Sequence, residues 1–237
     1  MGSVYLLTLR QLAGRWRLSI MAVLALMPVV ITMMMLRSDN AASVVDFEQT
    51  VLGAMLAGAI APLAVLAIAA AAFGNEVEDR TLANLTLSPI PRWKIVLPKF
   101  LAAITVASPL VAVSALLTAH IAFLGEWPAT IAITVSMAVG VAMYASLFVW
   151  LGLVSAQAIG IGLLYIVLWE GFFTGYVSGV RLLSIRYHAI ALMHGLDPRR
   201  FPTEQHVSLA AASGFAVVVI GGFLLLTMRK LRKMDVP

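Results

Sequence analysis

Six long apolar segments alternate with short polar segments along the chain. They cover approximately residues 18–36, 51–73, 95–124, 129–154, 156–177 and 207–228. A helix needs about 20 apolar residues to cross the hydrocarbon core of a bilayer, and all six segments are about that long or longer. The pattern therefore predicts an all-α integral membrane protein with six transmembrane helices.

Two of these segments have boundaries that need comment. The third is longer than a single span and contains Pro98, so we expect its first part, "WKIVLPKF", to lie at the interface and to bend into the membrane. The short sequence "GEWP" (125–128) predicts a tight connection between the third and fourth spans. The fourth and fifth spans meet near "VSAQ" (154–157), where few polar residues mark the boundary.

The composition agrees with this pattern. Hydrophobic residues make up 62% of the chain and the mean hydropathy is +0.99, whereas soluble domains are roughly 45–50% apolar. The 237 residues are enough for one membrane domain, 1–237, without a separate soluble domain of normal size. The absence of cysteine excludes disulfides and thiolate metal sites.

The N-terminus combines a basic amphipathic segment with an apolar run, as a signal peptide does. The run from Leu18 to Leu36 is long enough to span, however, and it lacks a small-x-small cleavage site. We therefore expect the first span to be retained.

Six spans place both termini on one side of the membrane, and the distribution of basic residues tests which side this is. One side holds eleven of them: Arg10, Arg15, Arg17, Arg80, Arg92, Lys94, Lys99, Arg229, Lys230, Arg232 and Lys233. The other side holds five: Arg37, Arg181, Arg186, Arg199 and Arg200. Lysine and arginine collect on the cytoplasmic side, so we expect both termini there. This asymmetry explains the net charge of +5 without nucleic-acid binding.

The loop 74–94, between the second and third spans, is the most charged part of the chain. Residues 75–94 contain six charged residues: Glu76, Glu78, Asp79, Arg80, Arg92 and Lys94. Residues 74–87 can form a short helix, in which Glu76 and Arg80 would pair at i,i+4 and Leu82 and Leu85 would form an apolar pair. The prolines of "SPIP", including Pro89, would end this helix.

This loop has two interpretations on its chemistry alone. Its charges could simply keep a polar loop in water. Alternatively, the loop could be a docking element for a soluble protein partner. In either case Trp93 between Arg92 and Lys94 is typical of an anchor at the membrane interface.

A family resemblance favours the second interpretation. The stretch "EVEDRTLANLTLSPIPRWKIVLPKFLAA" resembles the loop between the second and third spans of ABC-2 type transporter permeases. The resemblance is carried by Glu78, Arg80, Thr81, Leu82, Leu85, Ser88, Pro89, Ile90, Arg92, Lys99 and Leu101 to Ala103. The chain departs from the family pattern at Asp79-Arg80, where a glycine is usual. Heme-exporter B subunits of cytochrome c maturation have a related loop and size, and they remain an alternative.

The resemblance implies a specific mechanism. Such permeases pair in the membrane, with a second copy or a homologous permease, and each binds a cytoplasmic ATPase subunit through a coupling helix in this loop. The implied function is ATP-driven transport, in the direction of export, across a bacterial inner membrane. The implied coupling residues are Glu76, Glu78, Asp79, Arg80, Leu82, Leu85, Pro89 and Arg92.

The chain is not expected to be an enzyme. A phosphate-binding P-loop needs Gly-Lys-[Ser/Thr], whereas the four lysines follow Trp93, Pro98, Arg229 and Arg232. We therefore expect no cofactor on this chain, and the resemblance implies that ATP and Mg belong to the partner ATPase.

The fifth span contains a carboxylate, Glu170, and a glycine pattern. A carboxylate within a membrane is costly and is a functional candidate, here for a substrate route or gate. The alternatives are a structural polar contact, a pairing with Arg181 or Arg186, or a protonated acid. Gly171, Gly175 and Gly179 form two G-x-x-x-G steps, which predict close helix packing within the chain or across a dimer, or else a lining that widens for substrate.

The outer segment 178–206 is amphipathic. Leu182, Ile185, Ala189 and Leu196 share one helical face, while Arg181, Ser184 and His188 lie on another. We expect a helix lying in the outer interface or dipping partly into the membrane. The histidines of this segment fit no metal-ligand spacing, so no metal site is predicted.

Two other classes of function remain open from the sequence. A secondary transporter would more often show inverted repeats with broken helices, and no convincing repeat relates residues 1–124 to 125–237. A membrane scaffold without an ATPase would use the charged loop as a general docking site.

Overall fold

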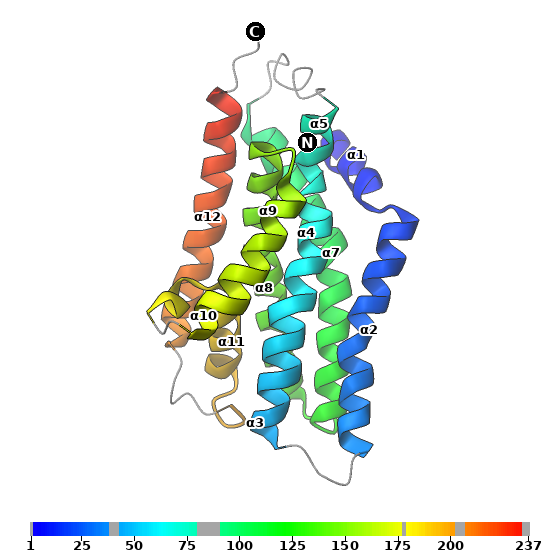
Figure 1. Cartoon of the computed structure of the whole chain (residues 1–237), viewed down its shortest axis with the longest axis vertical. Helices are drawn as coiled ribbons and strands as arrows, with labels where there is room; N and C mark the ends of the chain where they lie inside the picture. The colour runs from blue at the N-terminus through cyan, green and yellow to red at the C-terminus, as the bar shows by residue number, and fades with distance from the viewer. Residues whose placement is uncertain (1, 38–42, 80–90, 177–178, 202–206, 234–237) are drawn as a thin grey trace.

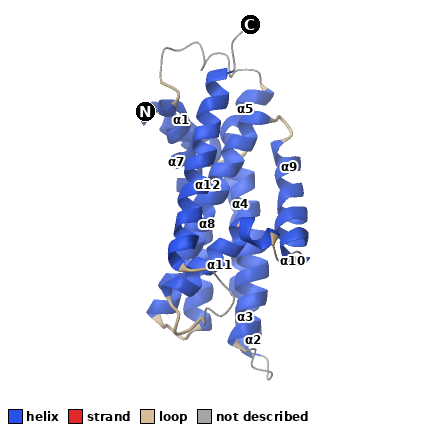
Figure 2. Cartoon of the chain, turned by 90° about the vertical axis from the view of Figure 1, so that its left-hand side faces the viewer, coloured by secondary structure: helices blue, strands red, loops and turns tan. Residues whose placement is uncertain are grey.

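The computed structural model describes residues 2–37, 43–79, 91–176, 179–201 and 207–233. In these ranges the chain is helical without strands, and the helices run side by side in one elongated bundle (Figures 1 and 2). Six candidate spans are long and apolar enough to cross a membrane: Arg15–Arg37, Val44–Ala69, Trp93–Ala122, Trp127–Val154, Ala158–Tyr176 and Leu209–Lys233. The predicted all-α fold with six spans is therefore confirmed.

The first two spans follow a short N-terminal helix. Helix α1 (Gly2–Leu12) precedes α2 (Arg15–Arg37), which is the first span. The second span contains α3 (Val44–Phe47), the π-helical segment η1 (Glu48–Ile60) and α4 (Ala61–Ala69). Helix α5 (Ala71–Glu78) continues from it after Ala70.

The remaining four candidate spans lie between Trp93 and Lys233. Helices α7 (Trp93–Ala122) and α8 (Trp127–Val154) are the third and fourth spans. The fifth span consists of α9 (Ala158–Leu164), the π-helical segment η2 (Tyr165–Phe173) and α10 (Thr174–Tyr176). A 3₁₀ turn, η3 (Val180–Leu183), and α11 (Ile185–Leu196) lead to α12 (Leu209–Lys233).

Helix α8 forms the centre of the bundle. It packs against α7, α4, α11 and α12, and residues along most of its length are buried. Two of its buried serines bond back to their own helix: Ser136 to the carbonyl of Ile133, and Ser146 to that of Met143. Such local bonds let hydroxyl groups sit in an apolar interior without a partner from another helix.

The third span differs from the sequence-based expectation. Instead of an interfacial stretch followed by a bend, α7 is one continuous helix of 30 residues from Trp93, with Pro98 and Pro109 inside it. Ile95, Val96 and Phe100 on its first turns are buried against the rest of the bundle. Tertiary packing of this apolar face outweighs the lost hydrogen bond at Pro98.

The connection between α7 and α8 is tight, as predicted. Leu124 and Gly125 both have positive φ, and the Gly125 N–H donates to the carbonyl of His120 at 2.9 Å. This bond closes the end of α7 with a left-handed turn that glycine favours. The predicted boundary near 154–157 is also present, since α8 ends at Val154 and α9 begins at Ala158.

The outer amphipathic helix packs against three other elements of the bundle. Helix α11 contacts α8, α12 and η1, and its apolar Ile185, Ala189 and Met193 are buried. His188, which the sequence places on the polar face, is buried as well, and its ring stacks on Phe215 at a centroid distance of 3.7 Å. The predicted outer helix is therefore present and packs against the bundle, and its position relative to the membrane stays a prediction.

Candidate functional site

One end of the bundle brings together the chain segments that the sequence assigns to one side. Figure 1 shows α1, α5 and the C-terminal end of α12 at the same end of the bundle. Helix α1 packs on α7 and α5, burying Leu12 and Thr8. The Tyr5 hydroxyl donates a hydrogen bond to Thr105 Oγ1 at 3.0 Å, which further ties α1 to α7.

A buried ion pair joins the helices on either side of the charged loop. Lys99 of α7 is 1% exposed, and its Nζ lies 2.6 Å from Oε1 of Glu76 in α5. The same ammonium donates to the carbonyl of Ala72 and lies over the Phe73 ring, 4.5 Å from its centroid. An ammonium buried in this way is stable only with such partners. The pair holds α5, which continues the second span, against the first turns of the third span, next to the charged loop.

The predicted coupling residues that the structure describes differ in exposure and in their partners. Glu76 faces Lys99, whereas Glu78 and Asp79 at the end of α5 are exposed. Arg80, Leu82, Leu85 and Pro89 lie outside the described residues, so the expected Glu76–Arg80 pair and the leucine pair cannot be placed. Within the described part, the predicted helix over 74–87 is a continuation of the second span that ends at Glu78.

The predicted interfacial anchor begins the third span. Arg92 precedes the first turn of α7, Trp93 is 45% exposed, and the Lys94 ammonium lies 5.7 Å from the Trp93 ring centroid. An exposed ring beside a cation suits the boundary between lipid and water.

Sequence reasoning missed the role of Lys99. It counted this residue only among the basic residues on one side and in the family motif. A signal was nevertheless present, because Lys99 is a cation within the apolar segment 95–124. A cation at that depth requires a partner, and Glu76 is among the acids nearest in sequence.

Glu170 is fully buried and bonded to the start of α11. Its carboxylate accepts hydrogen bonds from the Ser184 hydroxyl at 2.5 Å, the Ile185 N–H at 2.9 Å and the Tyr165 hydroxyl at 3.0 Å. The Ser184 oxygen in turn accepts from the Tyr187 N–H, so it caps the helix. A carboxylate with three donors at a helix N-terminus is well stabilised. The sequence left a pairing of Glu170 with Arg181 or Arg186 as one alternative. Among the described residues no such ion pair is present, and the carboxylate accepts these three hydrogen bonds instead.

The predicted glycine motif does not pack helices together within this chain. A Cβ built on Gly175 or Gly179 would meet no atom within 4 Å, and one on Gly171 would meet only the Ile166 carbonyl of its own helix. Close approach occurs instead at Gly152 of α8, where a Cβ would lie 2.2 Å from the carbonyl oxygen of Ala70. Packing across a second chain remains open for the predicted glycines.

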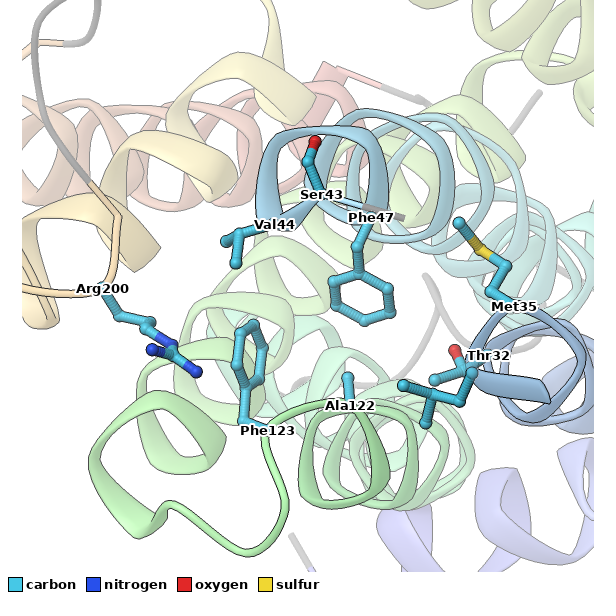
Figure 3. Close-up of a pocket in the computed structure, with 9 residues that line it drawn as sticks. Thr32, Met35, Ser43, Val44, Phe47, Ala122, Phe123 and Arg200 are labelled. Atoms are coloured by element: carbon cyan, nitrogen blue, oxygen red, sulfur yellow. The ribbon is translucent and has the colours of Figure 1, made fainter. Parts of the chain in front are cut away.

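The opposite end of the bundle is closed by aromatic contacts. Phe123 makes edge-to-face contacts with Phe47 and Phe201, with ring centroids 5.6 Å apart in both pairs. Figure 3 shows a small pocket beside this cluster, with the Arg200 guanidinium over Phe123, 5.2 Å from the ring centroid. The His194 ring lies beside Phe201 of this cluster, and its Nε2 is 2.6 Å from Glu48 Oε1.

The comparison with known families agrees with the arrangement of spans. Residues 9–188 match the family described as ABC-2 family transporter protein. This match covers α2 through the first residues of α11, and therefore includes the charged loop and five of the six spans. No curated protein matches the chain. The chain belongs to the ABC-2 family of transporter proteins and is a multi-pass membrane permease of that family.

Proposed function

We propose that this chain is the membrane-spanning subunit of an ATP-driven exporter in a bacterial inner membrane. It binds a separate cytoplasmic ATPase subunit through residues 76–92, at the end of the bundle that carries both termini. This proposal rests on the family membership and on one structural observation, the buried pair of Lys99 and Glu76 at the root of the loop.

The ion pair supports coupling because it joins the two helices that flank the loop, α5 and α7. A force applied by a partner to the exposed Glu78 and Asp79 reaches α5 directly. Through Glu76 and Lys99 it then acts on α7 as well. A partner that changes shape during its ATP cycle can therefore tilt the second and third spans as one unit, which is the type of movement that alternating access requires.

ATP and Mg bind to the partner ATPase in this proposal, and this chain performs no hydrolysis. The sequence is consistent with that division, because none of its four lysines stands in a Gly-Lys-[Ser/Thr] motif. The chain supplies the path across the membrane and the surface on which the ATPase acts.

A second permease, either a copy of this chain or a homologue, completes the transport path in this proposal. The first, fifth and sixth spans are the least covered within the chain, and in the fifth and sixth Gly175, Gly214 and Gly221 would accept a Cβ without contact. Open glycine positions allow the backbones of two helices to approach closely. These observations are consistent with a partner at the fifth and sixth spans.

Co-purification with the ATPase tests the coupling proposal. The tagged chain is solubilised mildly from its native host, and its partners are identified by mass spectrometry. We expect a stoichiometric P-loop ATPase with the wild-type chain, and its loss with Glu78→Arg combined with Leu82→Asp. Glu78 is exposed at the end of α5, so charge reversal there should leave membrane insertion intact.

A matched double variant at the other end of the bundle provides the control. Glu126→Arg with Leu124→Asp introduces the same two changes of charge at residues that are exposed. The ATPase should remain bound to this variant. Retention of the ATPase by the Glu78/Leu82 variant, or its equal loss from both variants, would contradict docking at residues 76–92.

A further inference from the structure

A second cavity lies between the second span, the end of the fifth span and α11. Its volume is about 380 Å³. The lining residues are Glu48, Gln49, Gly53, Thr174, Gly175, Arg181, Ser184, Arg186, Tyr187 and Ile190. This size is within the range of small-molecule sites in proteins, roughly 300–1,000 Å³. The lining combines two cations with hydroxyl and amide groups.

The position of Arg186 depends on glycines of the second span. A Cβ built on Gly58 would lie 3.2 Å from Nη1 and 3.3 Å from Cζ of Arg186, and one on Gly53 would lie 3.6 Å from Nη2. The guanidinium therefore lies against the π-helical segment η1 at a place where side chains are absent. The guanidinium N–H groups of Arg186 are positioned at the cavity wall by contact with the glycine backbone of η1. Among the described residues, no ion pair with a carboxylate holds them.

The carboxylates near the cavity are bonded elsewhere. Glu48 Oε1 lies 2.6 Å from His194 Nε2, and Glu170 accepts the three hydrogen bonds that begin α11. Among the described residues, neither Arg181 nor Arg186 forms an ion pair with a carboxylate. The lining thus has two guanidinium groups and one carboxylate, and that carboxylate already has a partner.

A cation beside membrane spans needs a counter-charge, because an uncompensated charge is costly there. We propose that this cavity binds the phosphate group of an amphipathic ligand, with Arg181 and Arg186 as the phosphate-binding residues. Arginine is suited to phosphate because its planar guanidinium donates two parallel hydrogen bonds to two oxygens. Gln49, which also lines the cavity, adds a side-chain amide to the same site.

The surroundings of Arg181 indicate an amphipathic ligand rather than a fully water-soluble one. Leu182 and Leu183, which follow Arg181 in η3, are 51% and 61% exposed. An apolar tail attached to a phosphate in the cavity would cover these leucines. Ile190 at the cavity wall extends the apolar contact. This inference concerns ligand binding by the permease alone and does not depend on the ATPase.

The test measures binding to the purified full-length chain in a non-ionic detergent. The probes are dihexanoyl phosphatidic acid, dihexanoyl phosphatidylcholine and inorganic phosphate, each titrated by microscale thermophoresis. We expect phosphatidic acid to bind at least tenfold more tightly than phosphatidylcholine, because choline neutralises the phosphate charge and blocks one side of it. Inorganic phosphate should compete with phosphatidic acid but bind more weakly, since it lacks the tail.

Variants assign the binding to the cavity. Arg186→Gln should weaken the binding of phosphatidic acid at least tenfold. Arg181→Gln should do so too, and because Arg181 is exposed, this variant keeps the test valid if Arg186→Gln fails to fold. Arg199→Gln is the matched control, an exposed arginine of the same outer segment that does not line this cavity.

The outcomes separate clearly. Loss of binding in the two cavity variants, with wild-type binding in Arg199→Gln, would establish the site. If inorganic phosphate binds as tightly as phosphatidic acid, the site takes free anions and the amphipathic part of the proposal is wrong. Equal affinity for phosphatidic acid and phosphatidylcholine, or less than a twofold change in both cavity variants, would overturn the proposal.

Discussion

Lys99 Nζ and Glu76 Oε1 lie 2.6 Å apart, and this contact connects the end of α5 with the beginning of α7. The two helices that flank the charged loop in the sequence are therefore bonded to each other. The movement of one helix end is therefore transmitted to the other through a short charged bond. This relationship is the strongest structural reason for assigning a mechanical role to this end of the protein.

Removing one partner of this pair should destabilise the protein. Lys99→Met leaves the Glu76 carboxylate without its ammonium, and Glu76→Gln leaves a buried ammonium with the Ala72 carbonyl as its remaining acceptor. Breaking a buried pair by removing one member costs about 3–5 kcal/mol. Thermal unfolding in detergent should show a marked loss of Tm for each single variant.

The double variant Lys99→Met with Glu76→Gln should recover most of this loss, because no uncompensated charge remains in the interior. Lys94→Met is the control, since it removes only a cation–π contact, worth about 0.5–1 kcal/mol, at a partly exposed site. A double variant whose loss of Tm equals the sum of the two single losses would show that the charges act independently.

Glu170→Gln should loosen α11 in particular. The substitution keeps the size of the side chain but places an amide among the hydrogen-bond donors Ser184, Ile185 and Tyr165. Hydrogen bonds to a charged acceptor are worth about 1.5–3 kcal/mol, so we expect hydrogen exchange over residues 185–196 to accelerate at least tenfold. Tyr176→Phe, at an exposed tyrosine at the end of the same span, should leave that exchange unchanged.

The same variant distinguishes a structural role from a transport role for Glu170. If Glu170 acts in a substrate route or gate, Glu170→Gln should reduce transport while the exchange of α11 stays as in the wild type. Faster exchange together with reduced transport would assign the effect to the helix cap.

Gly152→Ala should be strongly destabilising, whereas Gly160→Ala should not. A Cβ at Gly152 would lie 2.2 Å from the Ala70 carbonyl oxygen, a contact with backbone that side-chain movement cannot relieve. Overpacking a core position costs roughly 1–3 kcal/mol, and here we expect the upper end of that range. A Cβ at Gly160 would meet nothing within 4 Å. The amount of folded protein after size-exclusion chromatography and its Tm measure the difference.

Single cysteines can test the orientation in the membrane, because the natural sequence contains none. Asp79→Cys and Leu124→Cys introduce thiols at exposed residues at opposite ends of the bundle. With both termini in the cytoplasm, a membrane-impermeant maleimide should label Cys at position 124 in intact cells, and Cys at position 79 only after the cells are opened. The reverse labelling would invert the proposed topology.

Much of the architecture could be predicted from the sequence. The number of spans, the tight turn at Gly125 and the boundary near residues 154–157 follow from local patterns of apolar length and turn-forming residues. The family membership also follows from a local signal, because the motif around the charged loop is contiguous in the chain. Such features are determined by neighbours in sequence, and single-chain reasoning is suited to them.

The roles of individual polar residues depended on contacts between distant segments. Lys99 and Glu76 are 23 residues apart, and Glu170 and Ser184 are 14 apart. No periodicity relates such pairs, because each forms only after separate helices have packed together. For the same reason the sequence grouped His188 with Arg181 and Ser184 on one helical face, and it did not indicate that the His188 ring is buried against Phe215.

The sequence by itself determined that this protein crosses the membrane six times and which loop carries its charge, since the thickness of a bilayer and the cost of burying charge act on each segment separately. Only the tertiary structure decided which charges are exposed and which are bonded in the interior. It placed Lys99 against Glu76, Glu170 at the start of α11 and Arg186 over Gly58. These contacts depend on how whole helices pack, and close packing is a property of surfaces that meet in space rather than of residues that are adjacent in the chain.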